Sequence, residues 1–321
     1  MRSSLTLILA AALAATCSTP DGGSGSAKTS IAVIPKGTTH VFWRSVEAGA
    51  RRAASELGVE IIWKGPLKEN DRALQISVVE QFVTEGVSGI VLAPLDDNAL
   101  LRPVRGAMAK GIPVIIFDSN LNGKVGEDFV SFVATDNYAG GRMAGEEMAR
   151  LLEGRGKVAM LRYMVGSAST THREQGFLDA LKEHPGIELI LENQYGGATS
   201  GESIQKSEEL LDTLRQADGI FCPNESSTYG MLVTLRKHNL AGKVRFVGFD
   251  SSEELVRGLE EGQLQALVLQ NPRHMGYMAV KTMVDHLNGR PVPERIDTGV
   301  TLVTRENLDQ PEIRQLVKTE E

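Results

Sequence analysis

The sequence is poor in cysteine, in aromatic residues and in basic charge. It has 321 residues, of which two are cysteines and 5% are aromatic, and its net charge is −7. Proteins that bind nucleic acid usually carry a basic face, and no basic run occurs in this chain, so we expect no nucleic-acid partner. Cys222 lies in an apolar segment, and Cys17 is its only possible disulfide partner within the chain. We therefore predict that Cys222 is a core residue.

Motifs of the common enzyme classes are missing as well. The chain has no GxxxxGK[ST] phosphate loop and no HExxH zinc motif, and its histidines show no metal-ligand spacing. A GxGxxA match at residues 154–159 precedes a predicted strand instead of following one, which is the wrong context for a dinucleotide. We therefore predict that the protein is not an enzyme and holds no cofactor and no metal.

The amino terminus has the features of an export signal. Arg2 supplies positive charge, and the apolar residues 5–15 are fewer than the roughly 20 that span a bilayer. The segment ends at Cys17 and resembles a bacterial lipoprotein signal, in which the cysteine is lipidated; an ordinary signal peptide cleaved nearby is the alternative. The Gly/Ser-rich residues 18–29 predict a flexible tether. We expect a protein of the periplasm or cell envelope, held to a membrane by a lipid anchor on Cys17.

From residue 30 onward, short apolar strands alternate with helices, which is typical of a parallel sheet covered on both faces. The predicted strands are residues 31–34, 60–63, 89–93, 113–117 and 130–134, and then 157–161, 187–191, 219–222, 245–249 and 265–269. Helices are predicted between them, including Arg173–Glu183 and Ile204–Leu214, and the charged tail 306–321 predicts a short surface helix. The two series predict an α/β protein with two similar lobes.

The first strand, loop and helix predict one wall of a binding pocket. Residues 31–43 read IAVIPKGTTHVFW, and ligands of open parallel sheets bind just past the carboxyl ends of the strands. Lys36 and His40 lie in this loop, and the aromatic pair Phe42 and Trp43 follows it. The grouping favours a pocket for a small polar ligand with an apolar face. The alternative is that the two aromatic residues begin the buried face of the helix.

Polar side chains also follow other predicted strands. Just past strand ends lie Asp118, Asn224, Asp250 and Gln270, and Arg173 enters from a loop before a helix. Each can bond a hydroxyl group, and unpaired buried charge is costly, so a ligand with many hydroxyls would satisfy them. Helix capping is the alternative for any one of them, and Asp118 with Asp250 could also form an acid/base pair.

Several motifs together resemble the bacterial ribose-binding-protein family, the periplasmic sugar-binding proteins of ABC importers. They are IAVIPKGTTHVFW, GIVLAP, PVIIFDSN, ATDNYAGG, GSASTTHREQGF, IFCPNESS, VGFDSS and LVLQNP, and the resemblance covers residues 31–303. It implies the type I periplasmic binding protein fold, in which two Rossmann-like lobes are joined by a hinge and hold a sugar between them. We place the N-terminal lobe at residues 30–135 and 271–302, and the C-terminal lobe at residues 136–270 and 303–321.

The resemblance also implies ligand-binding roles. Phe42 and Trp43 match the aromatic pair that stacks on the sugar ring. The polar ligand positions of the family match Asp118, Arg173, Asn224, Asp250 and Gln270. The chain departs from the ribose-type pattern at Lys36 and His40, where that pattern has serine and asparagine, and at Ser119, where it has arginine. The IPK motif is also similar to the autoinducer-2-binding and rhamnose-binding branch.

The charges expected in the cleft set Lys36 and Arg173 against Asp118 and Asp250. This balance favours a neutral monosaccharide or polyol over a sugar acid or a sugar phosphate. The expected partners are this ligand and a membrane permease of an ABC transporter, which reads the closed form, and we expect a monomer. A sensory input to a chemoreceptor or kinase is the alternative. A repressor effector domain is another, although a repressor needs a DNA-binding head where this chain has a signal peptide.

Overall fold

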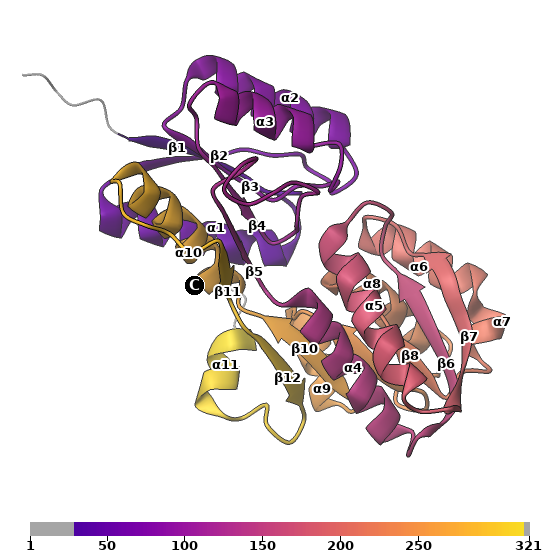
Figure 1. Cartoon of the computed structure of the whole chain (residues 1–321). Helices are drawn as coiled ribbons and strands as arrows, with labels where there is room; N and C mark the ends of the chain where they lie inside the picture. Colours follow the sequence, from indigo (N-terminus) through magenta and orange to yellow (C-terminus); the bar gives the residue numbers. More distant parts are fainter. Residues whose placement is uncertain (1–28, 318–321) are drawn as a thin grey trace, which may run out of the picture.

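The computed structural model describes residues 29–317 and contains two six-stranded sheets. The sheets belong to two lobes that lie side by side (Figure 1). We call them the N-lobe, with strand order β11-β5-β4-β3-β1-β2, and the C-lobe, with strand order β12-β10-β9-β8-β6-β7. When the strands of each lobe are counted along the chain, strands with the same count occupy the same position in the two sheets. The lobes therefore repeat one topology. The prediction of an α/β protein with two similar lobes is confirmed.

The N-lobe is a wholly parallel sheet with helices on both faces. Its strands are β1 Ser30–Ile34, β2 Glu60–Trp63, β3 Gly89–Leu92, β4 Val114–Phe117, β5 Ser131–Ala134 and β11 Arg295–Asp297. Its helices are α1 Val41–Leu57, α2 Arg72–Glu85, α3 Leu101–Ala109 and α10 Pro272–Leu287. Ile31 and Val33 of β1 pack toward α1 and α10, whereas Ala32 and Ile34 pack toward α2 and α3. Apolar residues on both faces explain why the strands are continuous apolar runs.

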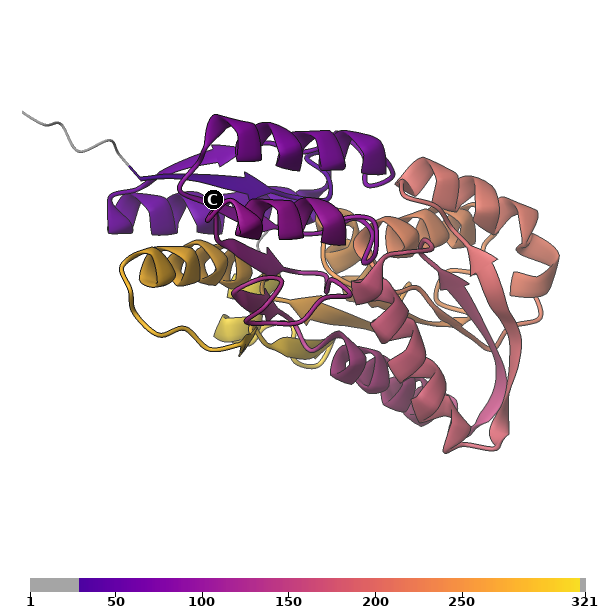
Figure 2. The same ribbon diagram turned by 45° about the horizontal axis from the view of Figure 1, so that its top comes forward.

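The C-lobe is parallel except for its edge strand β12, which runs antiparallel to β10. Its strands are β6 Arg155–Arg162, β7 Gly186–Tyr195, β8 Gly219–Phe221, β9 Arg245–Phe249, β10 Ala266–Gln270 and β12 Val300–Thr304. Its helices are α4 Asn137–Leu151, α5 Ala168–Lys182, α6 Ser200–Glu209, α7 Leu211–Leu214, α8 Glu225–Lys237, α9 Glu253–Glu260 and α11 Pro311–Val317. Helices α4 and α5 cover one face, and α8, α9 and α11 cover the other (Figure 2).

The chain crosses between the lobes three times, after β5, after β10 and after β11. The third crossing differs from the prediction, which assigned residues 271–302 to the N-terminal lobe. Strand β12 begins at Val300 and pairs with β10 through Gln270 and Val300, so the crossing lies at residues 298–299. The sequence pattern missed this because neither β11 nor β12 has the continuous apolar character of a central strand.

Two helix predictions also need correction. Helix α5 begins at Ala168, so Arg173 lies inside the helix and not in the loop before it. The predicted helix 204–214 is two helices, α6 and α7, separated at Leu210, and α6 begins earlier, after a capping box at Thr199 and Glu202. The tail helix is present as α11.

Some predictions concern residues outside the described range. Cys17 and nearly all of the tether lie outside residues 29–317, so lipidation stays a prediction. Within that range, none of the helices has the length and apolar character needed to cross a membrane. Cys222 is fully buried, as predicted for a core residue, and burial raises the pKa of its thiol.

Candidate functional site

The carboxyl ends of the strands of both lobes face each other, and the predicted site residues meet there. All nine line one cavity: Lys36, His40, Phe42, Trp43, Asp118, Arg173, Asn224, Asp250 and Gln270. Glu69, Tyr163, Ser167, Ser169, Thr170 and Glu225 complete the lining. We refer to the expectation that ligand-binding residues lie just past the ends of parallel strands as the strand-end rule. It identifies side chains that lie more than 200 residues apart in the sequence, from Lys36 to Gln270, and that line one cavity in the structure.

Asp118 and Asp250 occupy equivalent positions in the two lobes, directly after β4 and β9. Both are buried, and both have positive backbone φ angles, 60° for Asp118 and 65° for Asp250. Residues other than glycine rarely adopt this conformation, and aspartate is among those that tolerate it best. Backbone strain of this kind often marks functional sites. Here it turns one carboxylate from each lobe into the cavity.

Lys36 joins the two lobes at the cavity. Its ammonium nitrogen lies 3.0 Å from Asp118 Oδ2 of its own lobe and donates a 2.9 Å hydrogen bond to Ser169 Oγ of the C-lobe. Lys36 is only 3% exposed, so Asp118 and Ser169 take the place of water around its ammonium group.

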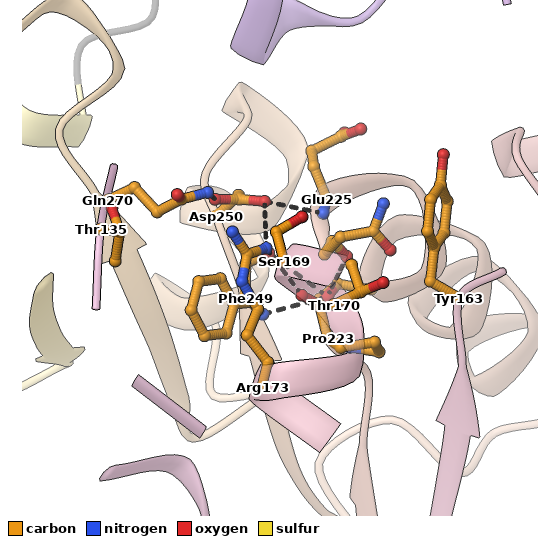
Figure 3. A network of polar contacts seen from close by, with 12 residues as sticks. Thr135, Tyr163, Ser169, Thr170, Arg173, Pro223, Glu225, Phe249, Asp250 and Gln270 are labelled. Carbon is orange, nitrogen blue, oxygen red and sulfur yellow. Dashed lines mark hydrogen bonds and ion pairs between the residues drawn. The ribbon is translucent and has the colours of Figure 1, made fainter. Parts of the chain in front are cut away.

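Arg173 is held by the C-lobe on several sides. Its Nε donates to Asn137 Oδ1 at 2.8 Å, and another guanidinium nitrogen donates to the Pro223 carbonyl at 2.9 Å. The guanidinium lies over the Phe249 ring, 4.0 Å from its centre, and 3.7 Å from Asp250 Oδ2 (Figure 3). Burial lowers the pKa of Arg173, although nearby carboxylates, first of all Asp250, oppose this shift. The planar group is therefore fixed in orientation beside Asp250.

Asp250 and Gln270 form a second polar pair beside Arg173. Gln270 Nε2 donates to Asp250 Oδ1 at 2.7 Å, and the Glu225 backbone N–H donates to Asp250 Oδ2 at 3.2 Å. Burial raises the pKa of Asp250, which Arg173 and Gln270 partly offset. The buried Gln270 Oε1 has no hydrogen-bond partner among the described residues. A buried acceptor without a partner is costly, and a hydroxyl donor from a ligand would satisfy it.

Asn224 lines the cavity, but its side chain is used locally. Its Oδ1 accepts from the Ser227 N–H at 3.4 Å and caps helix α8, and its Nδ2 donates to Ser226 Oγ at 3.0 Å. Helix capping, the alternative considered from the sequence, is therefore what the side chain does in this structure. A role in ligand binding stays a prediction for this residue.

The aromatic pair does not form one flat wall. The rings of Phe42 and Trp43 are 5.0 Å apart and nearly perpendicular, at 87°. Trp43 is 2% exposed and packs in the N-lobe core with Val46 and Phe117, whereas Phe42 is half-buried. Trp43 thus serves the core as well as the cavity, which combines the two interpretations left open by the sequence.

Glu69 and Tyr163 are central to the cavity and were missed in the sequence. Tyr163 directly follows β6, so the strand-end rule applied to every strand would have found it, whereas Glu69 lies six residues past the end of β2 and outside the reach of that rule. Glu69 Oε1 accepts from Trp43 Nε1 at 2.7 Å and lies 3.1 Å from His40 Nδ1. Burial alone would raise the pKa of Glu69, but the hydrogen bond from His40, the charges of His40 and Lys36 and the Trp43 donor lower it to about 2.

The added carboxylates change the charge balance of the cavity. Glu69 and Glu225 join the two predicted aspartates, so four carboxyl groups share the lining with the three predicted basic residues Lys36, His40 and Arg173. Burial lowers the pKa of His40, but the hydrogen bond from its ring to Glu69 and the charge of Glu69 outweigh this and raise it. Burial raises the pKa of Glu225 and of Asp250, which shifts both carboxyls toward their neutral forms. The lining therefore has no excess of basic groups, which an anionic ligand would need.

The lobes are closed on each other in this structure. Besides the contact between Lys36 and Ser169, the Ser169 N–H donates to Ser119 Oγ at 3.1 Å, and the Asp97 N–H donates to the Gly166 carbonyl at 3.2 Å. About 30 Å³ of space remains among the lining side chains, whereas ligand pockets are usually at least about 300 Å³. Among the residues from 29 to 317, no cluster of His, Cys, Asp and Glu could hold a metal ion.

Comparison with known proteins places this site in a family context. The family described as "Periplasmic binding protein domain" matches residues 31–291. The D-allose-binding periplasmic protein of Escherichia coli is 30% identical over 84% of this chain and 88% of its own length. The ribose import binding protein of Haemophilus influenzae is 28% identical over 88% of this chain and 93% of its own length.

A solved structure with a bound sugar has the same fold. It is a carbohydrate transporter solute-binding protein from Agrobacterium radiobacter in complex with D-arabinose. It is 33% identical to this chain, with a TM-score of 0.87 over 91% of this chain and all of that one. Since the family match alone spans well over half of the sequence, this chain belongs to the periplasmic binding protein domain family.

Proposed function

We propose that this chain is the solute-binding component of an ABC importer and captures a neutral monosaccharide or related polyol between its lobes. The observation that carries the proposal is the pair of strained, buried aspartates, Asp118 and Asp250, one from each lobe, facing one cavity. Relatives that bind ribose, D-allose and D-arabinose support this ligand class.

The polar groups suit a ligand with several hydroxyls. Asp118 and Asp250 accept hydrogen bonds, Lys36 and Arg173 donate them, and Gln270 Oε1 is an acceptor still without a partner among the described residues. Hydrogen bonds to charged groups are stronger than neutral ones, so each hydroxyl gains a charge-assisted contact. The carboxylates disfavour sugar acids and sugar phosphates. Similarity to the autoinducer-2-binding and rhamnose-binding branch stays a prediction.

The three crossings between the lobes would act as the hinge through which the ligand is released to a transporter. Rotation about these crossings would open the cavity and expose the ligand, and the closed form is what a permease in the membrane would recognise. We further propose that the protein is a monomer in the periplasm or cell envelope, held to a membrane by a lipid on Cys17. Permease and ATPase genes beside its own gene would favour transport over a sensory role.

Thermal-shift measurements test the proposed ligand class. The panel consists of ribose, D-allose, D-arabinose and, as an anionic comparison, D-gluconate. A ligand that binds only the folded state raises Tm by mass action, so we expect at least one neutral sugar to raise it and D-gluconate to leave it unchanged. The binding sugar should be recovered chemically unchanged by mass spectrometry. A panel without effect, or a sugar that is converted, would contradict the proposal.

A further inference from the structure

Glu69 makes a contact between the lobes that the proposed sugar site does not explain. Its carboxylate comes from the N-lobe loop after β2 and is 7% exposed. The hydroxyl of Tyr163, directly after β6 of the C-lobe, donates to Glu69 Oε2 at 3.0 Å. A side chain on Gly37 would come within 2.9 Å of Glu69 Cγ. The first loop of the chain therefore leaves room for Glu69 to reach the cavity.

The two oxygens of Glu69 have different partners. Oε1 is bonded within the N-lobe, to Trp43 Nε1 and to the ring of His40. Oε2 accepts the hydrogen bond from the hydroxyl of Tyr163, another residue of the cavity lining, across the cleft. Burial and the charge of Glu69 raise the pKa of Tyr163, so its hydroxyl stays protonated and acts as the donor. A carboxylate oxygen that accepts a hydroxyl hydrogen at the cavity is the contact that a sugar hydroxyl would make.

Space in the cavity requires some of these contacts to give way. About 30 Å³ remains, which is enough for roughly two water molecules. A sugar between the lobes therefore requires the groups that now meet across the cleft to separate, by side-chain movement or by rotation of the lobes. The bond between Tyr163 and Glu69 is one such contact. When it breaks, Oε2 of Glu69 is left with a buried negative charge that needs a new donor.

We propose that Glu69 is a ligand-recognition residue and that the Tyr163 hydroxyl occupies the place of a ligand hydroxyl on Glu69 Oε2. The inference rests on the proposed function, because it places Glu69 in the same sugar site. It adds a requirement on the ligand, which must present a hydroxyl donor to the N-lobe at Glu69 in addition to those at Asp118 and Asp250.

Two substitutions separate this role from a structural one. Glu69→Gln keeps an oxygen for Trp43 and His40 but replaces the charged acceptor that faces the cavity. We expect it to weaken sugar binding about tenfold to a hundredfold. Tyr163→Phe removes the competing donor and leaves Glu69 free for the ligand. We expect its affinity to equal that of the wild type or to be up to about tenfold higher.

The experiment is a calorimetric titration of the full chain with whichever of ribose, D-allose and D-arabinose binds most tightly, followed by monodeoxy analogues of that sugar. Glu208→Gln is the control, since Glu208 forms a carboxylate–histidine contact with His238 at 2.9 Å outside the cavity lining. The control should bind as the wild type does. The monodeoxy analogue that lacks the hydroxyl bound by Glu69 should bind the wild type more weakly than the parent sugar does. The same analogue should bind Glu69→Gln about as tightly as it binds the wild type.

The outcomes distinguish this inference from the proposed function. Wild-type protein that binds none of the three sugars overturns the proposed function and this inference with it. Wild-type protein that binds a sugar, with Glu69→Gln equally tight, overturns only this inference. Tyr163→Phe that weakens binding as much as Glu69→Gln also overturns it, because Tyr163 would then contribute to the complex. If Glu69→Gln does not fold, the Tyr163→Phe titration decides: affinity at or above that of the wild type supports the inference, and affinity about tenfold or more below it overturns the inference.

Discussion

At the scale of single residues, the cavity buries charged groups, and burial disfavours their charged forms. Burial raises the pKa of Asp250 and lowers that of Arg173, so each group is shifted toward its neutral form even though the two lie 3.7 Å apart. Burial disfavours the charged form of both groups, as is common for buried ion pairs. Such groups gain the most from a ligand that supplies hydrogen bonds to their charged forms.

Trp43 illustrates a residue with two roles. Because it is 2% exposed and packs in the N-lobe core, we expect Trp43→Ala to lower the free energy of unfolding by about 3–5 kcal/mol. It should also weaken sugar binding. Urea unfolding beside calorimetric titration separates the two effects. A variant as stable as the wild type would show that Trp43 is not a core residue.

Glu69 predicts a specific pH dependence of stability. Its pKa in the folded protein is lowered from 4.5 to about 2. A lowered folded pKa contributes stability that is present above the unfolded pKa and is lost as pH falls toward the folded one. As pH falls from about 4.5 to 2, the free energy of unfolding of the wild type should therefore decrease relative to that of Glu69→Gln. Urea unfolding at several pH values measures it. A constant difference would contradict the ionised state assigned to Glu69.

The sequence identified most of the cavity lining, but not how the side chains are used. Residues past the strand ends could be found because the rule depends only on strand positions. The capping role of Asn224 depends on the local geometry of the turn that leads to Ser227. The burial of Trp43 depends on core neighbours that are distant in the sequence, such as Phe117. Glu69 was missed because it lies several residues beyond β2 in a charged loop, where exposure is the usual expectation.

At the scale of elements, helix α5 positions Arg173 through close packing against α4. A Cβ on Gly176 of α5 would lie 2.2 Å from the Tyr138 carbonyl, and a Cβ on Gly141 of α4 would lie 2.0 Å from the Arg173 carbonyl. The two glycines let the helix backbones approach each other. The N-lobe has the same device in α1 and α10, where Gly49 and Gly276 face each other's helix backbones. Each lobe thus fixes a helix pair behind its sheet.

We expect Gly176→Ala to disturb both stability and binding. The added methyl group must push α4 and α5 apart, which costs about 1–3 kcal/mol of the free energy of unfolding and moves Arg173 relative to Asp250. Thermal melts and sugar titrations measure the two effects. Gly106→Ala is the matched control, because its Cβ would meet open space on α3. Alanine there should leave affinity unchanged and raise stability by up to about 1 kcal/mol. Equal behaviour of the two variants would contradict the packing account.

Elements with continuous apolar sequences were predicted well, and edge elements were not. Central strands such as β3 and β4 are buried on both faces and are recognisable from composition alone. The edge strands β11 and β12 are partly exposed and carry polar residues, so their sequences do not differ clearly from those of loops. The start of α5 was placed too late because its first turn is rich in serine and threonine, which usually favour caps and loops.

At the scale of the whole molecule, the order of strands explains how the two lobes form one site. Each lobe places equivalent strand ends at the cavity, and the chain crosses three times between the lobes (Figure 1). The sequence predicted the two lobes from the repeat of its pattern. It could not predict the closed arrangement, because that depends on side-chain contacts such as those of Lys36 and Tyr163 across the cleft.

The proposed anchor concerns a part of the chain before the folded lobes. The apolar residues 5–15 end near Cys17, and a Gly/Ser-rich segment follows. We expect wild-type protein in the membrane fraction and Cys17→Ala in the soluble fraction, because the lipid would be the only attachment. Cell fractionation with immunodetection measures this. Equal solubility of the two forms would contradict lipidation and leave an ordinary exported protein.

The central claim is that one sugar is held between the lobes by groups from both. Calorimetric titration with ribose, D-allose and D-arabinose tests it most directly when wild type, Asp118→Asn of the N-lobe and Asp250→Asn of the C-lobe are compared. We expect the wild type to bind one sugar per chain and each variant to bind it at least about tenfold more weakly, since each loses a charged hydrogen-bond acceptor. Absence of binding by the wild type, or wild-type affinity in either variant, would contradict the claim.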